Sequence, residues 1–178
     1  MRRLFFALWP DAATRSAIRR TTRQAVRQVG GRPVPAENYH LTLAFLGAQP
    51  EVRIPALLEA AAGVAPPRGE LSLDRLGCFS RARVLWLGPE RTPSGLRRDA
   101  HALWDALAPL GVARERRPFA AHLTLARKIA CPPEAQIRPI LWRYAGFILA
   151  ESVTDPRGAR YTVIAKWPRS GAADSTVK

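Results

Sequence analysis

The tetrapeptide His-Leu-Thr-Leu occurs twice in this chain of 178 residues, as His40–Leu43 and as His122–Leu125. Alternating polar and apolar residues are typical of a half-buried strand, in which side chains two positions apart leave the same face about 7 Å from each other. A helix would place the histidine and the threonine far apart around its axis. We therefore expect two strands, each with its leucines in a core and its histidine and threonine on the opposite face.

Two such strands facing each other would line one cleft with two imidazoles and two hydroxyls. One imidazole can accept a proton while the other donates one, because the pKa of an unperturbed histidine is about 6.5. Threonine hydroxyls can donate to the non-bridging oxygens of a phosphoryl group. A lone histidine on a strand is more often structural, but the repetition favours a site for phosphate chemistry made of His40, Thr42, His122 and Thr124.

The sequence around the two motifs repeats as well. Arg3–Pro10 is echoed by Arg83–Pro89, and each stretch is followed by a helix-like segment and then by its motif. A long repeat that occurs only twice predicts two duplicated lobes related by a pseudo-twofold axis, and not a solenoid. Apolar spacing predicts four helices, at Asp11–Val29, Ile54–Val64, Leu96–Leu110 and Pro133–Trp142.

These motifs resemble those of the 2H phosphoesterase superfamily, and most closely the bacterial RNA 2′,3′-cyclic phosphodiesterase family, also called 2′-5′ RNA ligase. The resemblance covers nearly the whole chain. Two departures from the family pattern are Ala121, where proline is usual, and Tyr39, where leucine is common. The similar segments are Arg3–Ala7, Glu37–Gly47, Gly77–Phe79 with Arg83–Gly88, Arg117–Arg127 and Tyr161–Pro168.

The resemblance implies an α+β fold with two pseudo-symmetric antiparallel-sheet lobes, outer helices and a central cleft. Residues 1–169 would form this single bilobal domain, and residues 170–178, which are small and polar, would form a flexible tail.

The resemblance also implies an activity, the hydrolysis of a terminal 2′,3′-cyclic phosphate on RNA to a 2′-phosphomonoester without metal or cofactor. His40 would be the proton donor, His122 the proton acceptor, and Thr42 and Thr124 would bind the phosphate. The direction of proton transfer comes from the family, since two near-identical motifs cannot reveal it. A reverse, ATP-independent 2′-5′ ligation is expected as the minor activity.

The charge of the chain fits a polyanionic partner. It carries 28 Lys+Arg against 14 Asp+Glu, a formal net charge of +14. Nearly all the basic residues are arginines, and the wealth of Ala, Gly and Pro beside them is equally typical of a nucleotide-composition bias. Arg127, five positions after His122, is the candidate for a phosphate contact, and Arg32, Arg81 and Arg117 are weaker ones.

Other features point to a compact cytoplasmic enzyme, expected to be a monomer with no membrane span, acting on RNA ends such as those of tRNA fragments. Cys78 and Cys131 form no CxxC or metal-binding pattern and are expected to be reduced. Core packing is expected for Phe45, Phe79, Phe119 and the five tryptophans. The alternatives are another 2H activity on 2′-5′ oligonucleotides or small cyclic nucleotides, a non-catalytic RNA-binding module, and, least in keeping with the sequence, a metal hydrolase.

Overall fold

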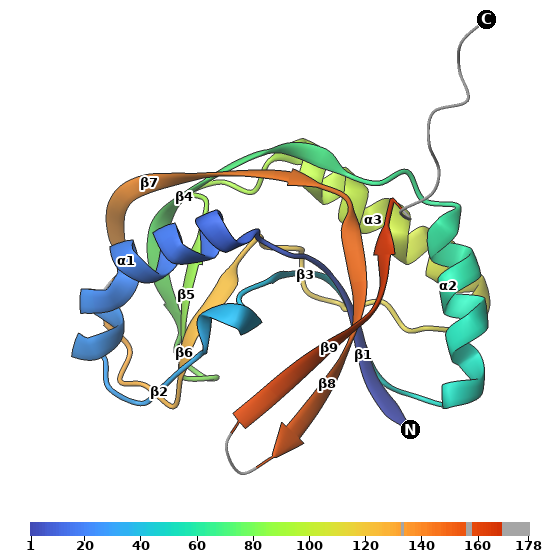
Figure 1. Ribbon diagram of the computed structural model, residues 1–178, viewed down its shortest axis with the longest axis horizontal. Coiled ribbons are helices and arrows are strands. Elements are labelled where there is room, and N and C mark those ends of the chain that lie inside the picture. The colour runs from blue at the N-terminus through green and yellow to red at the C-terminus, as the bar shows by residue number, and fades with distance from the viewer. Residues whose placement is uncertain (133, 156–157, 169–178) are drawn as a thin grey trace, which may run out of the picture.

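A nine-stranded antiparallel sheet runs through the part of the chain described by this computed structural model, residues 1–132, 134–155 and 158–168 (Figure 1). The strands are hydrogen-bonded in the order β7-β4-β5-β6-β3-β1-β8-β9, and β2 pairs with β6. The expected α+β class is confirmed. The strands are β1 Arg2–Leu8, β2 Arg32–Pro33, β3 Leu41–Gln49, β4 Arg68–Phe79, β5 Val84–Gly88, β6 Leu123–Arg127, β7 Ala135–Ala145, β8 Phe147–Asp155 and β9 Gly158–Trp167.

The sheet consists of two halves that meet at the two motif strands. Strands β7, β4, β5 and β6 form one half and β3, β1, β8 and β9 the other. The halves are not separate sheets, because β3 and β6 pair antiparallel through Leu41 and Leu123. This junction lies one residue after each motif histidine, so the fold brings the two motifs side by side.

In the described part of the chain three helices accompany the sheet, α1 Ala12–Gln28, α2 Ile54–Ala62 and α3 Ser94–Leu107, with short 3-10 turns η1 Ala36–Asn38, η2 Glu51–Arg53 and η3 Ala108–Leu110. Helix α1 begins where the Asp11 carboxylate accepts a hydrogen bond from the Thr14 backbone N–H at 2.7 Å. Helix α1 contacts β7, and α3 contacts β3, so each of these helices packs against the opposite half. The predicted strand-helix-strand repeat is confirmed as β1-α1-β3 and β5-α3-β6.

The fourth predicted helix, Pro133–Trp142, is wrong. Residues 135–142 of this segment belong to strand β7, and Pro133 lies outside the described residues. From Ile140 to Ala145 buried and exposed residues alternate strictly, which is the period of a strand. The apolar spacing that suggested a helix reflects one buried face of a strand at the edge of the sheet.

Strand β1 is buried on both faces and separates two apolar clusters. Leu4, Phe6 and Leu8 point into the main core, whereas Phe5 and Ala7 point to the opposite face. There they pack with Ile148 and Ala150 of β8, and Trp9, Phe45, Tyr161 and Val163 pack against this smaller cluster. The smaller cluster supports one wall of the site described below.

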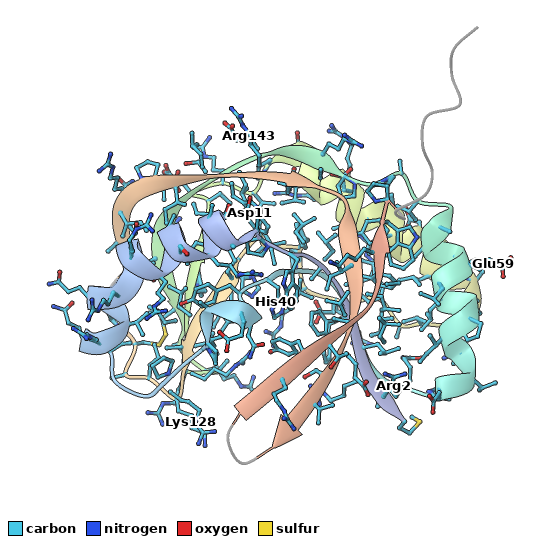
Figure 2. All side chains as sticks on the ribbon, in the orientation of Figure 1. Arg2, Asp11, His40, Glu59, Lys128 and Arg143 are labelled. Carbon is cyan, nitrogen blue, oxygen red and sulfur yellow. A yellow bond between two sulfur atoms is a disulfide. The ribbon has the colours of Figure 1, made fainter. Side chains whose placement is uncertain are left out.

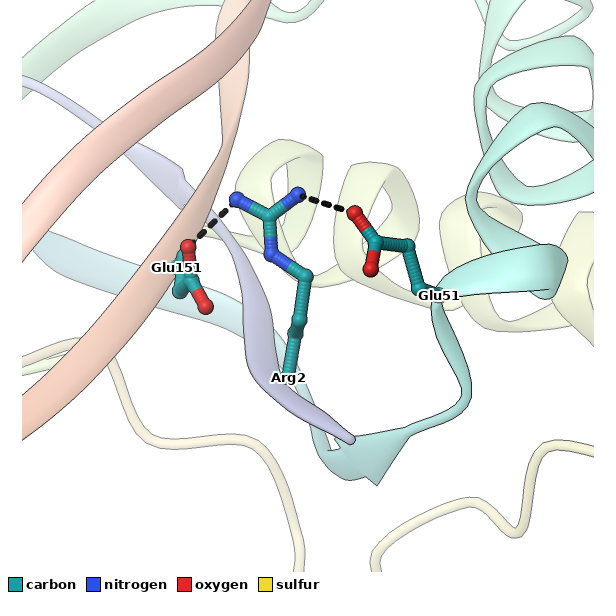
Figure 3. Close-up of polar contacts among 3 residues, drawn as sticks. All are labelled: Arg2, Glu51 and Glu151. Carbon is teal, nitrogen blue, oxygen red and sulfur yellow. Dashed lines mark hydrogen bonds and ion pairs between the residues drawn. The ribbon is translucent and has the colours of Figure 1, made fainter.

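Charged side chains hold the start of β1 in place. The Arg2 guanidinium donates a hydrogen bond to the carboxylate of Glu151 on β8 and lies 3.6 Å from the carboxylate of Glu51 in η2 (Figure 3). The guanidinium hydrogen bond lowers the pKa of Glu151 below its ordinary value. This network ties the start of β1 to β8 and to η2.

The expectation of two reduced cysteines is wrong in this structure. Cys78 at the end of β4 and Cys131 after β6 form a disulfide, with their Cα atoms 5.6 Å apart. This separation lies in the usual range for disulfides. The two residues are 53 positions apart, so only the pairing of β4, β5 and β6 brings them together.

Candidate active site at the junction of the half-sheets

The β3–β6 register places the four motif side chains on one face of the sheet. Leu41 and Leu123 are fully buried in the main core, so the residues before and after them point to the opposite face. Extending this antiparallel register by one residue sets His40 across from Thr124 and Thr42 across from His122. Each imidazole therefore faces the hydroxyl of the other motif, an arrangement that can surround one phosphoryl group.

Each imidazole is held by the same local hydrogen bond. Nδ1 of His40 lies 2.7 Å from the Asn38 carbonyl oxygen, and Nδ1 of His122 lies 2.8 Å from the Ala120 carbonyl oxygen. A carbonyl oxygen can only accept, so in both rings Nδ1 carries the hydrogen. Nε2 is then the nitrogen that is free to accept or donate a proton at a substrate.

The two supporting loops are themselves anchored to distant elements. The Asn38 side-chain amide donates to the Ala159 carbonyl oxygen on β9 at 2.8 Å. In the second motif the Ala121 N–H donates to Thr92 Oγ1 at 3.0 Å. The carbonyl that orients each histidine thus belongs to a segment fixed by a contact far along the chain.

Aromatic rings surround His40. Its ring centroid lies 4.8 Å from that of Phe5, 4.9 Å from that of Tyr161 and 5.6 Å from that of Trp9, which is stacked on it. Burial among these rings lowers the pKa of His40 from 6.5 to about 4, a result that includes the opposing hydrogen bond to Asn38 and the positive charge of Arg127. His40 is neutral at pH 7 when no substrate is bound.

His122 has a more open setting. The structure shows one aromatic contact for it among the described residues, an edge-on approach by Phe79 with ring centroids 4.9 Å apart. Burial lowers the pKa of His122 as well, opposed by the hydrogen bond to Ala120 and by the charge of Glu115. The two motifs are thus identical in sequence but differ in their surroundings.

A hollow of about 520 Å³, here called the catalytic hollow, opens against the first motif. His40 and Thr42 line it. His122 and Thr124 are not among its lining residues, and the pairing of β3 with β6 places them next to the first motif. Arg127 also lines the hollow, and its positive charge lowers the pKa of both histidines. The other lining residues are Arg3, Phe5, Arg32, Pro33, Val34, Pro35, Asn38, Phe45, Lys128, Ser152, Ala159 and Tyr161.

Two of the four arginine candidates line the catalytic hollow, and two do not. Arg127 and Arg32 both line the catalytic hollow and are paired in the β2–β6 register. Arg81 and Arg117 are exposed and are not among its lining residues. Figure 2 shows His40 in the middle of the molecule and Lys128 at its lower edge, and both residues line the hollow.

Sequence reasoning missed several residues of the site. Core packing was expected for Phe45 and Phe79, but Phe45 lines the hollow and Phe79 is 39% exposed against His122. Trp9, expected to serve packing, stacks on His40, and Tyr161 and Arg3 were not singled out as site residues. Their positions follow from the pairing of β1 with both β3 and β8, which the linear sequence does not display.

Two orienting carbonyls, two imidazoles, two hydroxyls and Arg127 thus lie together where β3 and β6 pair, a set of groups that can serve phosphoester chemistry. The comparisons with known proteins agree: residues 8–86 match the model of the family described as LigT like Phosphoesterase. The chain is 36% identical to the RNA 2′,3′-cyclic phosphodiesterase of Escherichia coli over 93% of its length and 95% of that protein. It therefore belongs to the LigT-like phosphoesterase family.

Other relatives and solved structures point the same way. The RNA 2′,3′-cyclic phosphodiesterase of Thermus thermophilus is 32% identical over 95% of this chain and 91% of that protein. The crystal structure of E. coli LigT complexed with 3′-AMP superposes with a TM-score of 0.84 at 34% identity, covering 93% of this chain and 97% of that one. The family expected from the two motifs is confirmed.

Two further findings concern metals and membranes. Within residues 1–132, 134–155 and 158–168, no three His, Cys, Asp or Glu side chains gather as possible metal ligands. No helix among the described residues is long and apolar enough to span a membrane.

Proposed function

We propose that this protein hydrolyses the terminal 2′,3′-cyclic phosphate of RNA to a 2′-phosphomonoester, with His40 and His122 as its acid–base pair. The observation that carries the proposal is the junction of β3 and β6, which sets each motif imidazole across from the hydroxyl of the other motif. The relatives named above, which are RNA 2′,3′-cyclic phosphodiesterases, support this substrate.

In the proposed reaction the cyclic phosphate lies between the two motifs. Nε2 of His122 takes a proton from a water molecule while the water oxygen bonds to phosphorus. The bond between phosphorus and the 3′ oxygen breaks, and protonated Nε2 of His40 gives its proton to that oxygen. The 2′ oxygen keeps its bond, so the product is a 2′-phosphomonoester. These steps use no metal ion and no cofactor.

The remaining polar groups stabilise charge on the phosphoryl oxygens. The hydroxyls of Thr42 and Thr124 donate to the non-bridging oxygens, and the Arg127 guanidinium balances the negative charge that grows in the transition state. Fixed donors of this kind need little rearrangement during the reaction.

Substrate binding must protonate His40, since its pKa is about 4 in the empty site. A bound phosphate anion raises the pKa of a neighbouring imidazole because it favours the charged form. The rate should therefore follow a bell-shaped dependence on pH, with one limb for each histidine.

The same site can join RNA ends if the 5′-hydroxyl of a second RNA takes the place of water. His122 would deprotonate this hydroxyl, and the product would be a 2′-5′ linkage made without ATP. Water is present at far higher concentration than RNA ends, so we propose ligation as the minor activity.

We also propose that the protein acts as a monomer in the cytoplasm, on RNA ends such as those of tRNA fragments. The Cys78–Cys131 disulfide bears on this location, because disulfides are rare in the cytosol. Trapping thiols with an alkylating reagent in intact cells decides the point: alkylated cysteines fit the cytoplasm, and a protected disulfide contradicts it.

The test of function uses a short RNA ending in 2′,3′-cyclic phosphate, incubated in chelator with the wild type, His40→Ala, His122→Ala and His101→Ala. His101 on α3 is the third histidine of the chain and serves as the matched control. We expect a 2′-phosphate product from the wild type and from His101→Ala, and losses of about 10²–10⁴ in turnover for the two motif variants. A 3′-phosphate product, or full activity in either motif variant, would refute the proposal.

A further inference from the structure

Helix α1 has an unusual distribution of charge. It carries five arginines, Arg15, Arg19, Arg20, Arg23 and Arg27, and no acidic residue. By contrast, α3 carries two arginines and two aspartates, and α2 carries one glutamate and no basic residue. A composition bias would spread arginine over all exposed helices, so it does not account for this difference.

The arginines are arranged along one side of α1. Arg19, Arg23 and Arg27 are four residues apart, which places them on one stripe of the helix over about 12 Å. All three are exposed, whereas Ile18 and Thr22 are buried against the rest of the molecule. Neither an ion pair nor a side-chain hydrogen bond joins these three guanidinium groups to another described residue.

This arginine stripe borders a hollow that is separate from the catalytic one but touches it. The second hollow measures about 360 Å³ and lies between α1 and the segment that leads to the first motif. It shares Pro33, Val34 and Pro35 with the catalytic hollow. Its lining residues are Arg19, Thr22, Arg23, Val26, Arg27, Pro33, Val34, Pro35, Ala36, Glu37 and Tyr39.

Basic residues line both hollows on either side of the segment that they share, and together they form a basic path. It starts at Arg127, Arg32 and Lys128 beside the catalytic site and crosses the exposed Pro33 and Pro35. It then reaches Arg19, Arg23 and Arg27. Figure 1 shows α1 on the same side of the molecule as β2, which carries Arg32, and β6, which carries Arg127.

One acidic group, Glu37, borders the second hollow, and its effect is visible at Tyr39. Burial raises the pKa of the Tyr39 hydroxyl, the Arg19 charge opposes the rise, and Glu37 adds to it. The single carboxylate leaves the wall of this hollow positive because three guanidinium groups outnumber it.

We propose that the arginine stripe of α1 binds the phosphates of the RNA strand that lies 5′ of the reacting cyclic end. This inference rests on the proposed function, and it names the part of the substrate that the catalytic site does not hold. A single strand fits because its phosphates repeat along one direction, as the arginines do. The exposed large apolar side chains of the described residues lie outside α1, so the helix has nothing to insert into a lipid surface.

The stripe makes binding depend on RNA length. A cyclic mononucleotide fills only the catalytic hollow, whereas a longer RNA also reaches α1. Each phosphate contact of a single strand contributes a slope of about −0.7 to the dependence of log affinity on log salt. Three contacts therefore account for a slope of about −2, or roughly 20-fold in affinity between 50 and 200 mM salt.

The test compares Arg19→Gln/Arg23→Gln/Arg27→Gln with the control Arg68→Gln/Arg97→Gln/Arg98→Gln, which removes the same charge from exposed positions outside both hollows. Glutamine is nearly as good a helix former as arginine, so α1 should stay folded. The substrates are a 2′,3′-cyclic mononucleotide and a 12-nucleotide RNA with a cyclic phosphate end. Binding of the same RNA ending in a 2′-phosphate is measured by fluorescence anisotropy from 50 to 200 mM salt.

For the α1 variant we expect a KM for the 12-mer raised about tenfold at low salt, a salt slope shallower by about 2, and an unchanged KM for the mononucleotide. The control variant should match the wild type. Equal losses in both variants, or no loss in the α1 variant, would overturn the inference. The anisotropy measurement distinguishes a failure of this inference from a failure of the proposed function. RNA binding that depends on α1 supports the inference even if no cyclic phosphate is hydrolysed.

Discussion

The two copies of the His-Leu-Thr-Leu motif differ less in their own atoms than in what surrounds them. Both histidines use Nδ1 to donate to the carbonyl two residues earlier, at 2.7 and 2.8 Å. However, His40 is enclosed by Phe5, Trp9 and Tyr161, whereas Phe79 is the aromatic neighbour that the structure gives His122. Local sequence thus fixes the tautomer of each ring, and the neighbouring strands set its proton affinity.

This difference assigns no proton direction by itself. In the empty site the pKa of both imidazoles is lowered, that of His40 to about 4. Because His40 is neutral in the empty site, it gains its proton only when the phosphate anion is bound beside it, which fits the donor role proposed for His40. The more open His122 can receive a water molecule at its Nε2, which fits the acceptor role.

The largest expected effect comes from removing both imidazoles together. If they act as one acid–base pair, His40→Ala/His122→Ala should fall little below the worse single variant, which itself loses about 10²–10⁴ in turnover. Single-turnover rates on cyclic-phosphate RNA measure this. If the loss in the double variant equals the product of the two single losses, the two histidines contribute independently and do not act as one acid–base pair.

The two motif threonines should contribute about equally to kcat. Thr42→Val and Thr124→Val each remove one hydroxyl donor at nearly constant volume, and we expect each to lower kcat by about 10². Thr→Ser at either position keeps the hydroxyl and should restore most of the rate. A loss confined to one of the two valine variants would mean that only one motif holds the phosphate.

The histidines should also contribute differently to stability at acidic pH. The folded-state pKa of His40 is about 4 and its unfolded value is 6.5, so the unfolded chain binds the extra proton as pH falls between them. This histidine therefore lowers the free energy of unfolding by up to about 3 kcal/mol between pH 6.5 and 4.

Urea unfolding of the wild type and of His40→Gln at pH 7.5 and 4.5 measures this contribution. The variant should lose less stability on acidification than the wild type. His122→Gln is the matched comparison, and we expect a smaller difference for it. An identical loss for wild type and His40→Gln would contradict the account of His40 burial.

The smallest effect concerns the aromatic enclosure itself. Trp9 stacks on His40, so Trp9→Leu admits water to the ring and should raise the pKa of His40 from about 4 toward 6.5. An NMR titration of the imidazole protons reports this value directly. Phe79→Leu, on the more open side, should change the pKa of His122 less. A larger change for His122 than for His40 would contradict the conclusion that aromatic rings enclose His40 more than His122.

Much of this site could be predicted from the sequence because its key information is local. Alternation placed His40 and Thr42 on one face, and the repeated spacing correctly predicted the β1-α1-β3 and β5-α3-β6 units. Residues supplied by neighbouring strands could not be predicted in this way. Tyr161 comes to His40 from β9, more than a hundred positions away, and no local pattern marks it.

The errors have the same origin. Strand β7 was mistaken for a helix because apolar spacing alone does not show which residues a partner strand covers. The Cys78–Cys131 disulfide depends on strand pairing and has no signature in the spacing of the cysteines. Phe79 was assigned to the core, although the end of β4 leaves it beside His122.

The most direct test of distinct roles for the two motifs uses a cyclic phosphate whose 3′ oxygen is replaced by sulfur. A thiolate leaves without being protonated, so a missing proton donor no longer slows the reaction, whereas a missing proton acceptor still does. We expect His40→Ala to regain most of the wild-type rate on this substrate and His122→Ala not to regain it. Rescue of His122→Ala with none of His40→Ala would contradict the assignment, and rescue of neither would contradict proton donation by these motifs.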